Sequence, residues 1–182
     1  KAAQHLLSLI NNILDLSKIE SGKIDIFIEV IPVYDLLDDI ILATTPLIKT
    51  KNNTLTFNAA ENLGKIESDY TKIRQILFNI IGNAAKFTTE GQITVTAERD
   101  KDSISISISD TGIGMTEEQI EKITTPFVQA DSSTTRKYGG TGLGLSVTEH
   151  LTKILNIELK IKSIPDKGSN FTLIIPLYFQ DN

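Results

Sequence analysis

The first 22 residues of the chain carry apolar side chains at the spacing of a helix. Leucine and isoleucine recur along one heptad seam, at Leu6, Leu9, Ile13 and Leu16. Gly22 can end such a helix, and an apolar stripe this wide on one short helix needs a partner helix to cover it. The pattern therefore predicts a helix over residues 1–22 that belongs to a helical bundle.

The next part of the chain predicts a strand, a helix and a second strand. Isoleucines alternate with other residues over residues 24–29, which is the spacing of a strand. Pro32 can open the following helix, and Pro46 must end or kink it. Residues 54–58 predict another strand, and a turn-rich stretch follows at residues 62–64.

The clearest helix begins at Asp69, a favourable N-cap residue, and continues to Phe87. Its apolar positions keep the i, i+3, i+4, i+7 pattern, at Ile73, Ile76, Leu77, Ile80, Ile81 and Ala84. Asn79, Asn83 and Lys86 stand at i, i+4 and i+7, so they project from one face beside this stripe. Amide oxygens suit a magnesium ion and an ammonium group suits phosphate. Taken alone, the three residues also fit an ordinary solvated helix face.

Two antiparallel strands are expected after this helix. Gly91 precedes apolar residues that alternate as far as Ala97. After a turn at residues 100–102, isoleucines alternate with serines over residues 104–108, which predicts a half-buried strand. A short helix is expected over residues 116–123.

The C-terminal part predicts a loop, a helix and a hairpin. Residues 127–140 are polar and rich in Ser and Thr, as in a surface loop. Residues 143–155 predict a helix, and residues 157–177 predict a hairpin. Since helices and antiparallel strands mix without a regular strand–helix–parallel strand repeat, the sequence predicts a two-layer α+β sandwich with helices on one face of a sheet.

Composition narrows the classes of function. The chain has 182 residues, enough for one domain with a short appendage, and a net charge of -5 that argues against nucleic acid as the main partner. It has no cysteine, which excludes disulfides, thiolate metal sites and cysteine nucleophiles. No apolar run approaches the roughly 20 residues of a membrane span, and no signal peptide is visible. Because Lys1 begins inside a helical pattern, we expect a fragment of a longer protein.

The segment from Asp110 to Gly114 follows a predicted strand. A carboxylate at a strand end can accept a hydrogen bond from the exocyclic amine of adenine, and glycines at positions 112 and 114 permit close backbone approach. An ordinary strand-ending turn is an equal alternative for so short a motif. The spacing after Gly114 is not that of a dinucleotide-binding fingerprint.

Four glycines fall within residues 139–144, directly before a predicted helix. Exposed backbone N–H groups and the helix dipole favour phosphate at such a place. A flexible hinge is the alternative. No Lys-Ser or Lys-Thr pair follows, so the segment is not a P-loop.

Together these segments resemble the histidine kinase branch of the gyrase, chaperone, kinase and mismatch-repair ATPase superfamily. RQILFNIIGNAAKFT resembles its N box, DTGIGM its first glycine box, PFVQAD its F box, GGTGLGL its second glycine box, and KGSNF its terminal glycine element. HLLSLINNILDLSKIESGKI is similar to the second helix of the dimerisation and phosphotransfer hairpin. The resemblance implies a Bergerat ATP-binding fold with a mixed sheet, a partial hairpin at residues 1–22 and a catalytic domain at residues 23–182.

For the phosphate end of the nucleotide, the resemblance implies that Asn83 is the main magnesium ligand, that Asn79 assists it and that Lys86 contacts phosphate oxygens. The second glycine box is expected to wrap the phosphates through backbone N–H groups of Gly140, Thr141, Gly142, Leu143 and Gly144. The cofactors implied are therefore ATP and Mg²⁺.

For the base end, the resemblance implies that Asp110 accepts a hydrogen bond from the adenine amine. Gly112 and Gly114, with Ile113 between them, would let the base approach. Ser169 stands where some relatives place a hydroxyl near adenine.

Position 79 separates branches of the superfamily. Gyrase-like and chaperone ATPases carry a glutamate there that activates water, whereas Asn79 cannot act as a general base. The resemblance therefore implies transfer of the γ-phosphoryl group to a histidine, promoted by positioning and charge stabilisation.

Some features depart from the family pattern. The acceptor-histidine stretch is missing: His5 lies on the second-helix pattern and His150 is expected on a helix surface. Thr124 replaces a frequent second aromatic of the F box, which weakens the expected packing of the ATP lid around Phe127.

Three functions stay open at this point: a protein-histidine kinase module, an ATP-binding or dimerising module without turnover, and a gyrase- or chaperone-type ATPase, which Asn79 disfavours. The implied partners are the acceptor helix of the parent kinase, a response regulator receiver domain and, in the full-length parent, a second subunit. The expected location is cytoplasmic, in a parent that a membrane anchor can hold.

Overall fold

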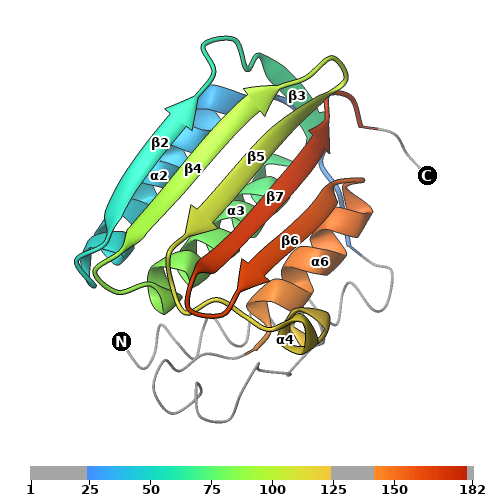
Figure 1. Ribbon diagram of the computed structural model, residues 1–182. Helices are drawn as coiled ribbons and strands as arrows, with labels where there is room; N and C mark the ends of the chain where they lie inside the picture. The colour runs from blue at the N-terminus through green and yellow to red at the C-terminus, as the bar shows by residue number, and fades with distance from the viewer. Residues whose placement is uncertain (1–23, 124–141, 180–182) are drawn as a thin grey trace, which may run out of the picture.

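The computed structural model describes residues 24–123 and 142–179, and their centre is a five-stranded mixed sheet (Figure 1). The strand order is β2-β4-β5-β7-β6, in which β2 and β4 are parallel and all other neighbours are antiparallel. The strands are β2 (Thr54–Ala59), β4 (Gln92–Arg99), β5 (Ser103–Asp110), β6 (Glu158–Ile164) and β7 (Gly168–Pro176).

Within residues 24–123 and 142–179, three helices cover one face of this sheet and none lies on the other, called here the open face (Figure 1). They are α2 (Val33–Lys49), α3 (Tyr70–Phe87) and α6 (Gly144–Ile154). A short helix, α4 (Glu117–Lys122), lies at one end of the sheet near β6. The predicted two-layer α+β sandwich is therefore confirmed.

The core forms where the apolar face of each element meets the other layer. On β5 the three isoleucines are fully buried while the intervening serines lie on the open face. On α3 the predicted stripe is buried along its whole length, at Ile73, Ile76, Leu77, Ile80, Ile81 and Ala84. The strand period of two and the helix period of 3.6 thus direct both sets of side chains to one interior.

Asp69 caps α3 as the sequence predicts. Its carboxylate accepts a hydrogen bond from the backbone N–H of Lys72 at 3.0 Å, which satisfies one of the free donors of the first turn. The second carboxylate oxygen accepts from the backbone N–H of Phe27 at 2.9 Å. One side chain therefore starts the helix and also holds the segment that precedes β1 (Glu29–Pro32).

The strand predicted over residues 24–29 is wrong in its bounds. Residues 24–28 are outside any strand, and β1 pairs antiparallel with β3 (Lys65–Ser68), a four-residue strand that the sequence analysis missed. Ile24 and Ile26 are partly buried against the core without a ladder partner. Alternating isoleucines indicated burial of one side of the segment, which does not require a hydrogen-bonded neighbour.

Pro46 does not end α2, which continues to Lys49. A proline removes one backbone donor, here the one that would serve the carbonyl of Leu42, a residue with 74% exposure. Water can reach a carbonyl at such an exposed position. The threonine hydroxyls just before the proline bond to carbonyls one turn back, Thr44 to Ile40 at 2.7 Å and Thr45 to Ile41 at 2.6 Å.

The remaining elements agree with the sequence. The short helix has the Thr116 cap with a complete capping box, the helix expected at residues 143–155 is α6, and the C-terminal hairpin is β6 and β7. The helix predicted over residues 1–22 and the loop predicted over residues 127–140 lie outside the described residues. Among the helices that are described, none has the length and apolarity to cross a membrane.

Leucine truncation at matched buried and exposed positions tests the placement of the core. Leu77→Ala, at a position with 0% exposure, should lower the free energy of unfolding by about 2–5 kcal/mol. Leu42→Ala, where the side chain is 74% exposed, should cost less than about 1 kcal/mol. Urea denaturation of both variants measures the difference, and equal losses would contradict the assigned helix faces.

Candidate nucleotide-binding site

Helix α3 presents the three polar residues that the sequence singles out. Asn79, Asn83 and Lys86 are all partly buried and lie beside the fully buried isoleucine stripe. Because the apolar stripe is held against the sheet, the rotation of the helix fixes where these three side chains project. The structure thus brings them together on one helix face.

Asn79 connects α3 to the start of α6. Its amide nitrogen donates to the carbonyl of Gly144 at 3.2 Å and approaches the hydroxyl of Thr148 at 3.4 Å. Both contacts are made by the amide nitrogen, and the amide oxygen has no hydrogen bond to a described residue. The end of the second glycine segment and the candidate metal-binding helix are therefore neighbours, as the site predicted from the sequence requires.

The Asn83 carboxamide has no hydrogen bond to any described residue, so its oxygen is available to a ligand. Amide oxygens are hard donors of the kind that Mg²⁺ takes together with phosphate oxygens and water. Among the described residues no group of three or more His, Asp or Glu side chains forms an alternative metal site. The donor set of Asn83 and Asn79 fits the magnesium ion that the sequence analysis expects.

Lys86 lies at the end of α3, with its ammonium 4.8 Å from the ring centroid of Phe87. Burial lowers the pKa of Lys86, and the positive charge of Lys51 lowers this pKa further. Both effects disfavour the charged ammonium while no anion is near. A phosphate oxygen at this place would favour the ammonium and reverse the shift.

Asp110 ends β5 and is a buried residue, with 8% of its surface exposed. Its Oδ1 accepts from the backbone N–H of Gly112 at 2.8 Å and lies 3.5 Å from the hydroxyl of Thr88. Burial raises the pKa of Asp110, while hydrogen bonds from the backbones of Gly112 and Ser169 and from Thr88 act in the opposite direction. A carboxylate accepts about four hydrogen bonds, so these three donors leave room for one from a ligand.

The glycines of the Asp110 loop are required by the protein itself. A Cβ at Gly112 would lie 2.5 Å from the carbonyl oxygen of Phe87 and 2.9 Å from Oδ1 of Asp110. Gly114 has a φ of +62°, and a Cβ there would lie 1.9 Å from the carbonyl oxygen of Ile164. The two glycines, which the sequence analysis expects to let a base come close, therefore also let the loop backbone pack closely against the end of α3 and the end of β6. Ile113, between the two, is 38% exposed.

The second glycine segment is described from Gly142 onward. Gly142 has a φ of +71°, and Leu143, which precedes α6, is fully buried and provides no side-chain cap for the first turn. The N–H groups at the start of α6, from Gly144, therefore begin next to Asn79. Phe127, Gly140 and Thr141 lie outside the described residues, so their expected contacts stay predictions.

Ser169 lies opposite Asp110 in the β5–β7 ladder. Its hydroxyl is 2.9 Å from the hydroxyl of Ser163 on β6, which itself donates to the carbonyl of Gly168 at 3.0 Å. The contact of Ser169 with the Asp110 carboxyl is made by its backbone N–H. His150 lies on a helix, as expected, but it is partly buried where an exposed residue was expected, with Nδ1 2.8 Å from the carbonyl oxygen of Ser146.

Sequence reasoning missed Thr88, which is fully buried and whose hydroxyl lies against Asp110. It also missed Asn53, whose side chain contacts the backbone at Thr88 and at Gly91. Thr88 is the last residue of the segment that resembles the N box, which is the signal that could have drawn attention to it. Nothing in the sequence near Asn53 distinguishes it from a surface turn residue, because its contacts lie 35 to 38 positions away.

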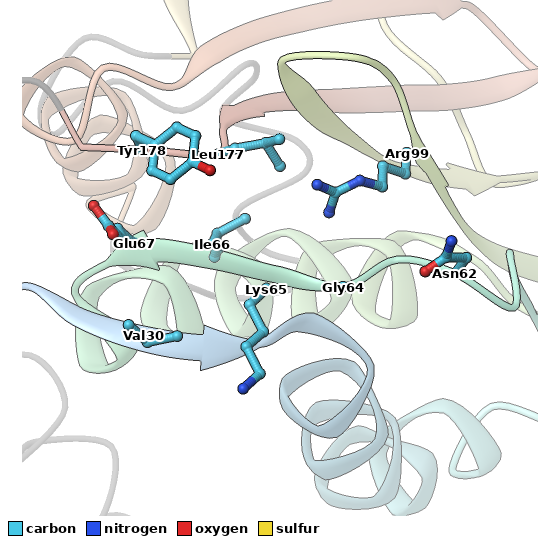
Figure 2. A pocket seen from close by; sticks show the side chains of 9 residues that line it. All are labelled: Val30, Asn62, Gly64, Lys65, Ile66, Glu67, Arg99, Leu177 and Tyr178. Carbon is cyan, nitrogen blue, oxygen red and sulfur yellow. The ribbon is translucent and has the colours of Figure 1, made fainter.

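A separate pocket of about 410 Å³ lies at the opposite end of the sheet (Figure 2). Arg99, which lines it, ends β4, whereas Asp110 pairs with Ile93 at the start of that strand. Figure 2 shows the Arg99 side chain beside Leu177 and above Gly64, and its guanidinium donates to the carbonyl of Leu63 at 2.6 Å. This pocket shares no residue with the candidate nucleotide site.

Comparison with known proteins identifies the family to which this fold belongs. Residues 68–178 match the model of the histidine kinase-, DNA gyrase B- and HSP90-like ATPases. The chain belongs to this family. Within it the chain is of the histidine kinase type, since the relatives described next are sensor histidine kinases and their catalytic domains.

Sequence relatives cover nearly the whole chain. The autoinducer 2 sensor kinase/phosphatase LuxQ of Vibrio vulnificus (strain YJ016) is 40% identical over 183 residues, which are 97% of this chain and 21% of that protein. The peroxide stress-activated histidine kinase mak2 of Schizosaccharomyces pombe is 34% identical over 183 residues, covering 94% of this chain and 8% of mak2. The chain thus spans about a fifth or less of the length of these relatives.

Solved structures share the fold. Full-length ShkA in complex with AMPPNP superimposes with a TM-score of 0.86 at 26% identity, over all of this chain and 38% of that one. The nucleotide-free catalytic domain of the histidine kinase ThkA gives 0.71 at 24% identity, over 85% of this chain and 99% of that one. The fold class predicted from the sequence is therefore that of histidine kinase catalytic domains.

Alanine at two glycines with opposite surroundings tests the geometry of the Asp110 loop. Gly114→Ala should lower the free energy of unfolding by at least about 1–2 kcal/mol because of the positive φ and the contact with Ile164. Gly82→Ala, in the middle of α3 with no atom within 4 Å of the new Cβ, should raise it by about 0.5–1 kcal/mol. Thermal denaturation without nucleotide compares the two, and a tolerated Gly114→Ala would contradict the loop geometry.

Proposed function

We propose that this chain binds Mg-ATP between α3 and the Asp110 loop and transfers the γ-phosphoryl group to a histidine on an acceptor helix of its parent kinase. The observation that carries the proposal is the position of Asn79. It stands beside Asn83 on α3 and bonds to Gly144 at the start of α6. Two segments that are far apart in the sequence, one expected to hold the metal and one expected to hold the phosphates, are thus adjacent. Asp110, at the end of β5, would hold the base.

At the base end, we propose that the exocyclic amine of adenine donates a hydrogen bond to the Asp110 carboxylate. The buried carboxylate is oriented by Gly112 and Thr88, and one of its lone pairs remains available. A purine with a carbonyl at the same position would place two acceptors against each other. The site would therefore distinguish adenine from 6-oxopurines, because an unpaired buried acceptor is costly.

At the phosphate end, Asn83 and Asn79 would hold Mg²⁺ through their amide oxygens, and Lys86 would contact phosphate. When bound, the metal would supply neutralisation of the negative charge on the phosphates. Gly144 and Thr148 act by positioning, because they fix which end of the Asn79 carboxamide faces the site. Burial lowers the pKa of Lys86, and a phosphate partner would stabilise its charged ammonium.

The chemistry proposed is direct phosphoryl transfer. A neutral imidazole nitrogen attacks the γ-phosphorus, the bond to the oxygen bridging the β- and γ-phosphates breaks, and ADP leaves with the electron pair. The nucleophile needs no base from this chain, which agrees with an amide at Asn79. A water-activating ATPase would need a carboxylate at that position.

Partners beyond ATP are part of the proposal. ThkA has been solved with the response regulator TrrA, and its complex superimposes on this chain with a TM-score of 0.71 at 21% identity. By family membership we propose that a receiver domain accepts the phosphoryl group from the parent's phosphohistidine, and that the parent forms a homodimer. The domain would act in the cytoplasm, in a parent that a membrane anchor can hold.

Phosphotransfer from labelled ATP to a separately supplied acceptor helix tests the proposal. The wild-type chain should form acid-labile phosphohistidine, and Asn83→Ala should reduce the rate at least about tenfold through loss of one metal contact. Leu42→Ala, exposed on α2, is the matched control and should retain the wild-type rate. Nucleotide binding without transfer would favour a binding module, and steady ATP hydrolysis without an acceptor would favour a gyrase- or chaperone-type ATPase.

The raised pKa of Asp110 predicts a pH dependence of base selectivity. The amine of adenine donates to the ionised carboxylate, so binding of ATP should weaken as the pH falls through the raised pKa. Binding of inosine triphosphate, which has no amine, should not share this loss. The ratio of the two affinities, measured by calorimetry across the acidic range, cancels titration of the phosphates. A constant ratio would contradict the assignment of Asp110 to the amine.

A further inference from the structure

The turn between α2 and β2 holds the end of α3 through a buried side chain. Asn53 is 7% exposed, and its amide nitrogen donates to the carbonyl of Thr88 at 2.9 Å. Its Oδ1 accepts from the backbone N–H of Gly91 at 3.0 Å. A carboxamide carries both a donor and an acceptor, so this one side chain serves both backbone groups at once.

Three successive carbonyls at the C-terminus of α3 have partners from outside the helix. The ammonium of Lys51 donates to the carbonyl of Lys86, the N–H of Ile113 donates to that of Phe87 at 3.3 Å, and Asn53 donates to that of Thr88. Helix C-termini leave such carbonyls without internal partners. Here donors from the α2–β2 turn and from the Asp110 loop bond to these carbonyls, so both segments are attached to the same helix end.

The contact of Asn53 with Thr88 continues to the candidate base site. The hydroxyl of Thr88 lies 3.5 Å from Oδ1 of Asp110, so the backbone position of Thr88 decides whether this hydroxyl reaches the carboxylate. Asn53 also fixes Gly91, where a Cβ would lie 2.5 Å from the hydroxyl of Thr111. Both ends of the short turn from Thr88 to Gly91 are thus held in place against the Asp110 loop.

We propose that Asn53 is a positioning residue for purine recognition, which acts through Thr88 to orient the Asp110 carboxylate toward a 6-amino group. The inference rests on the proposed binding of ATP and deepens it, because it names a residue outside every nucleotide-binding motif of the sequence as a determinant of base selectivity. Asn53 has no contact with the nucleotide in this account. Its effect is carried by the carbonyl of Thr88.

The opposing view gives Asn53 a purely structural role in closing the turn. The two views differ in what they predict for nucleotides that share phosphates but differ at position 6 of the purine. A structural role alone lowers the affinity for ATP and for inosine triphosphate equally, because the whole site loosens. A positioning role lowers the preference for ATP over inosine triphosphate.

Calorimetric affinities for ATP and inosine triphosphate, with Mg²⁺ present, test the proposal on wild type and Asn53→Asp. The variant keeps the size of the side chain and the acceptor for Gly91, but it replaces the donor to Thr88 by a carboxylate oxygen. We expect the ratio of ATP to inosine triphosphate affinity to fall about tenfold, the equivalent of one hydrogen bond to a charged group. The affinity for inosine triphosphate should change less than about twofold.

Thr88→Val supplies a second route if Asn53→Asp does not fold. It removes the hydroxyl at nearly constant volume and should lower the same ratio, and the double variant should lower it no further than the stronger single variant. Thr50→Ala, at an exposed position of the same turn whose hydroxyl bonds to the carbonyl of Leu47, is the matched control and should leave the ratio unchanged.

The outcomes distinguish a failure of the role of Asn53 from a failure of the proposed binding of ATP. An unchanged ratio, or equal losses for both nucleotides, overturns the role of Asn53 while ATP binding by the wild-type chain still supports the proposed function. Additive effects of Asn53→Asp and Thr88→Val also overturn it, since they show that Asn53 does not act through Thr88. A wild-type chain that binds neither nucleotide overturns the proposed function and the inference with it.

Discussion

A carboxylate buried at the end of a central strand has to be surrounded by hydrogen-bond donors, and the arrangement of the site follows from this constraint. Asp110 loses most of its contact with water, which raises its pKa. The donors come from three places: the following loop, strand β7 and the residue after α3. The helix end, the loop and the hairpin are therefore held together around one charged group. A ligand amine can complete this set of donors.

Helix α3 joins this base end to the phosphate end. One of its faces is buried in the core and fixes the helix on the sheet, and the adjacent face carries Asn79, Asn83 and Lys86. Burial of the isoleucine stripe therefore determines the direction of the polar side chains as well as stability. The contact of Asn79 with Gly144 extends the same rigid frame to the start of α6, where phosphate-binding N–H groups are expected.

Much of the fold could be predicted from the sequence because periodicity and local capping act over short distances. The Asp69 cap, the stripe of α3 and the isoleucine–serine alternation of β5 each identify an element without knowledge of the rest. Strand β3 was missed because a segment of four residues is too short to show a periodic pattern. Residues 24–28 show that a segment buried on one side can have the alternating pattern of a strand without being one. Whether Pro46 would end α2 could not be decided from the sequence, because the cost of a proline depends on the solvent exposure of a carbonyl one turn away.

The candidate site was predictable only in part, for the same physical reason. Residues on one helix face can be grouped by their spacing, so Asn79, Asn83 and Lys86 emerge together. Contacts between distant segments leave no local trace, and the link from Asn53 to Thr88 spans 35 positions. The contacts of Ser169 are of the same kind, since its hydroxyl lies against Ser163 and its backbone N–H faces Asp110. The expected position of this hydroxyl near adenine stays a prediction.

A crystal structure of this chain with Mg²⁺ and a non-hydrolysable ATP analogue tests the central claim most directly. The account predicts the exocyclic amine of adenine within about 3 Å of the Asp110 carboxylate and the amide oxygen of Asn83 bound to the metal. An adenine ring placed away from Asp110, or a metal without Asn83 among its ligands, would contradict it.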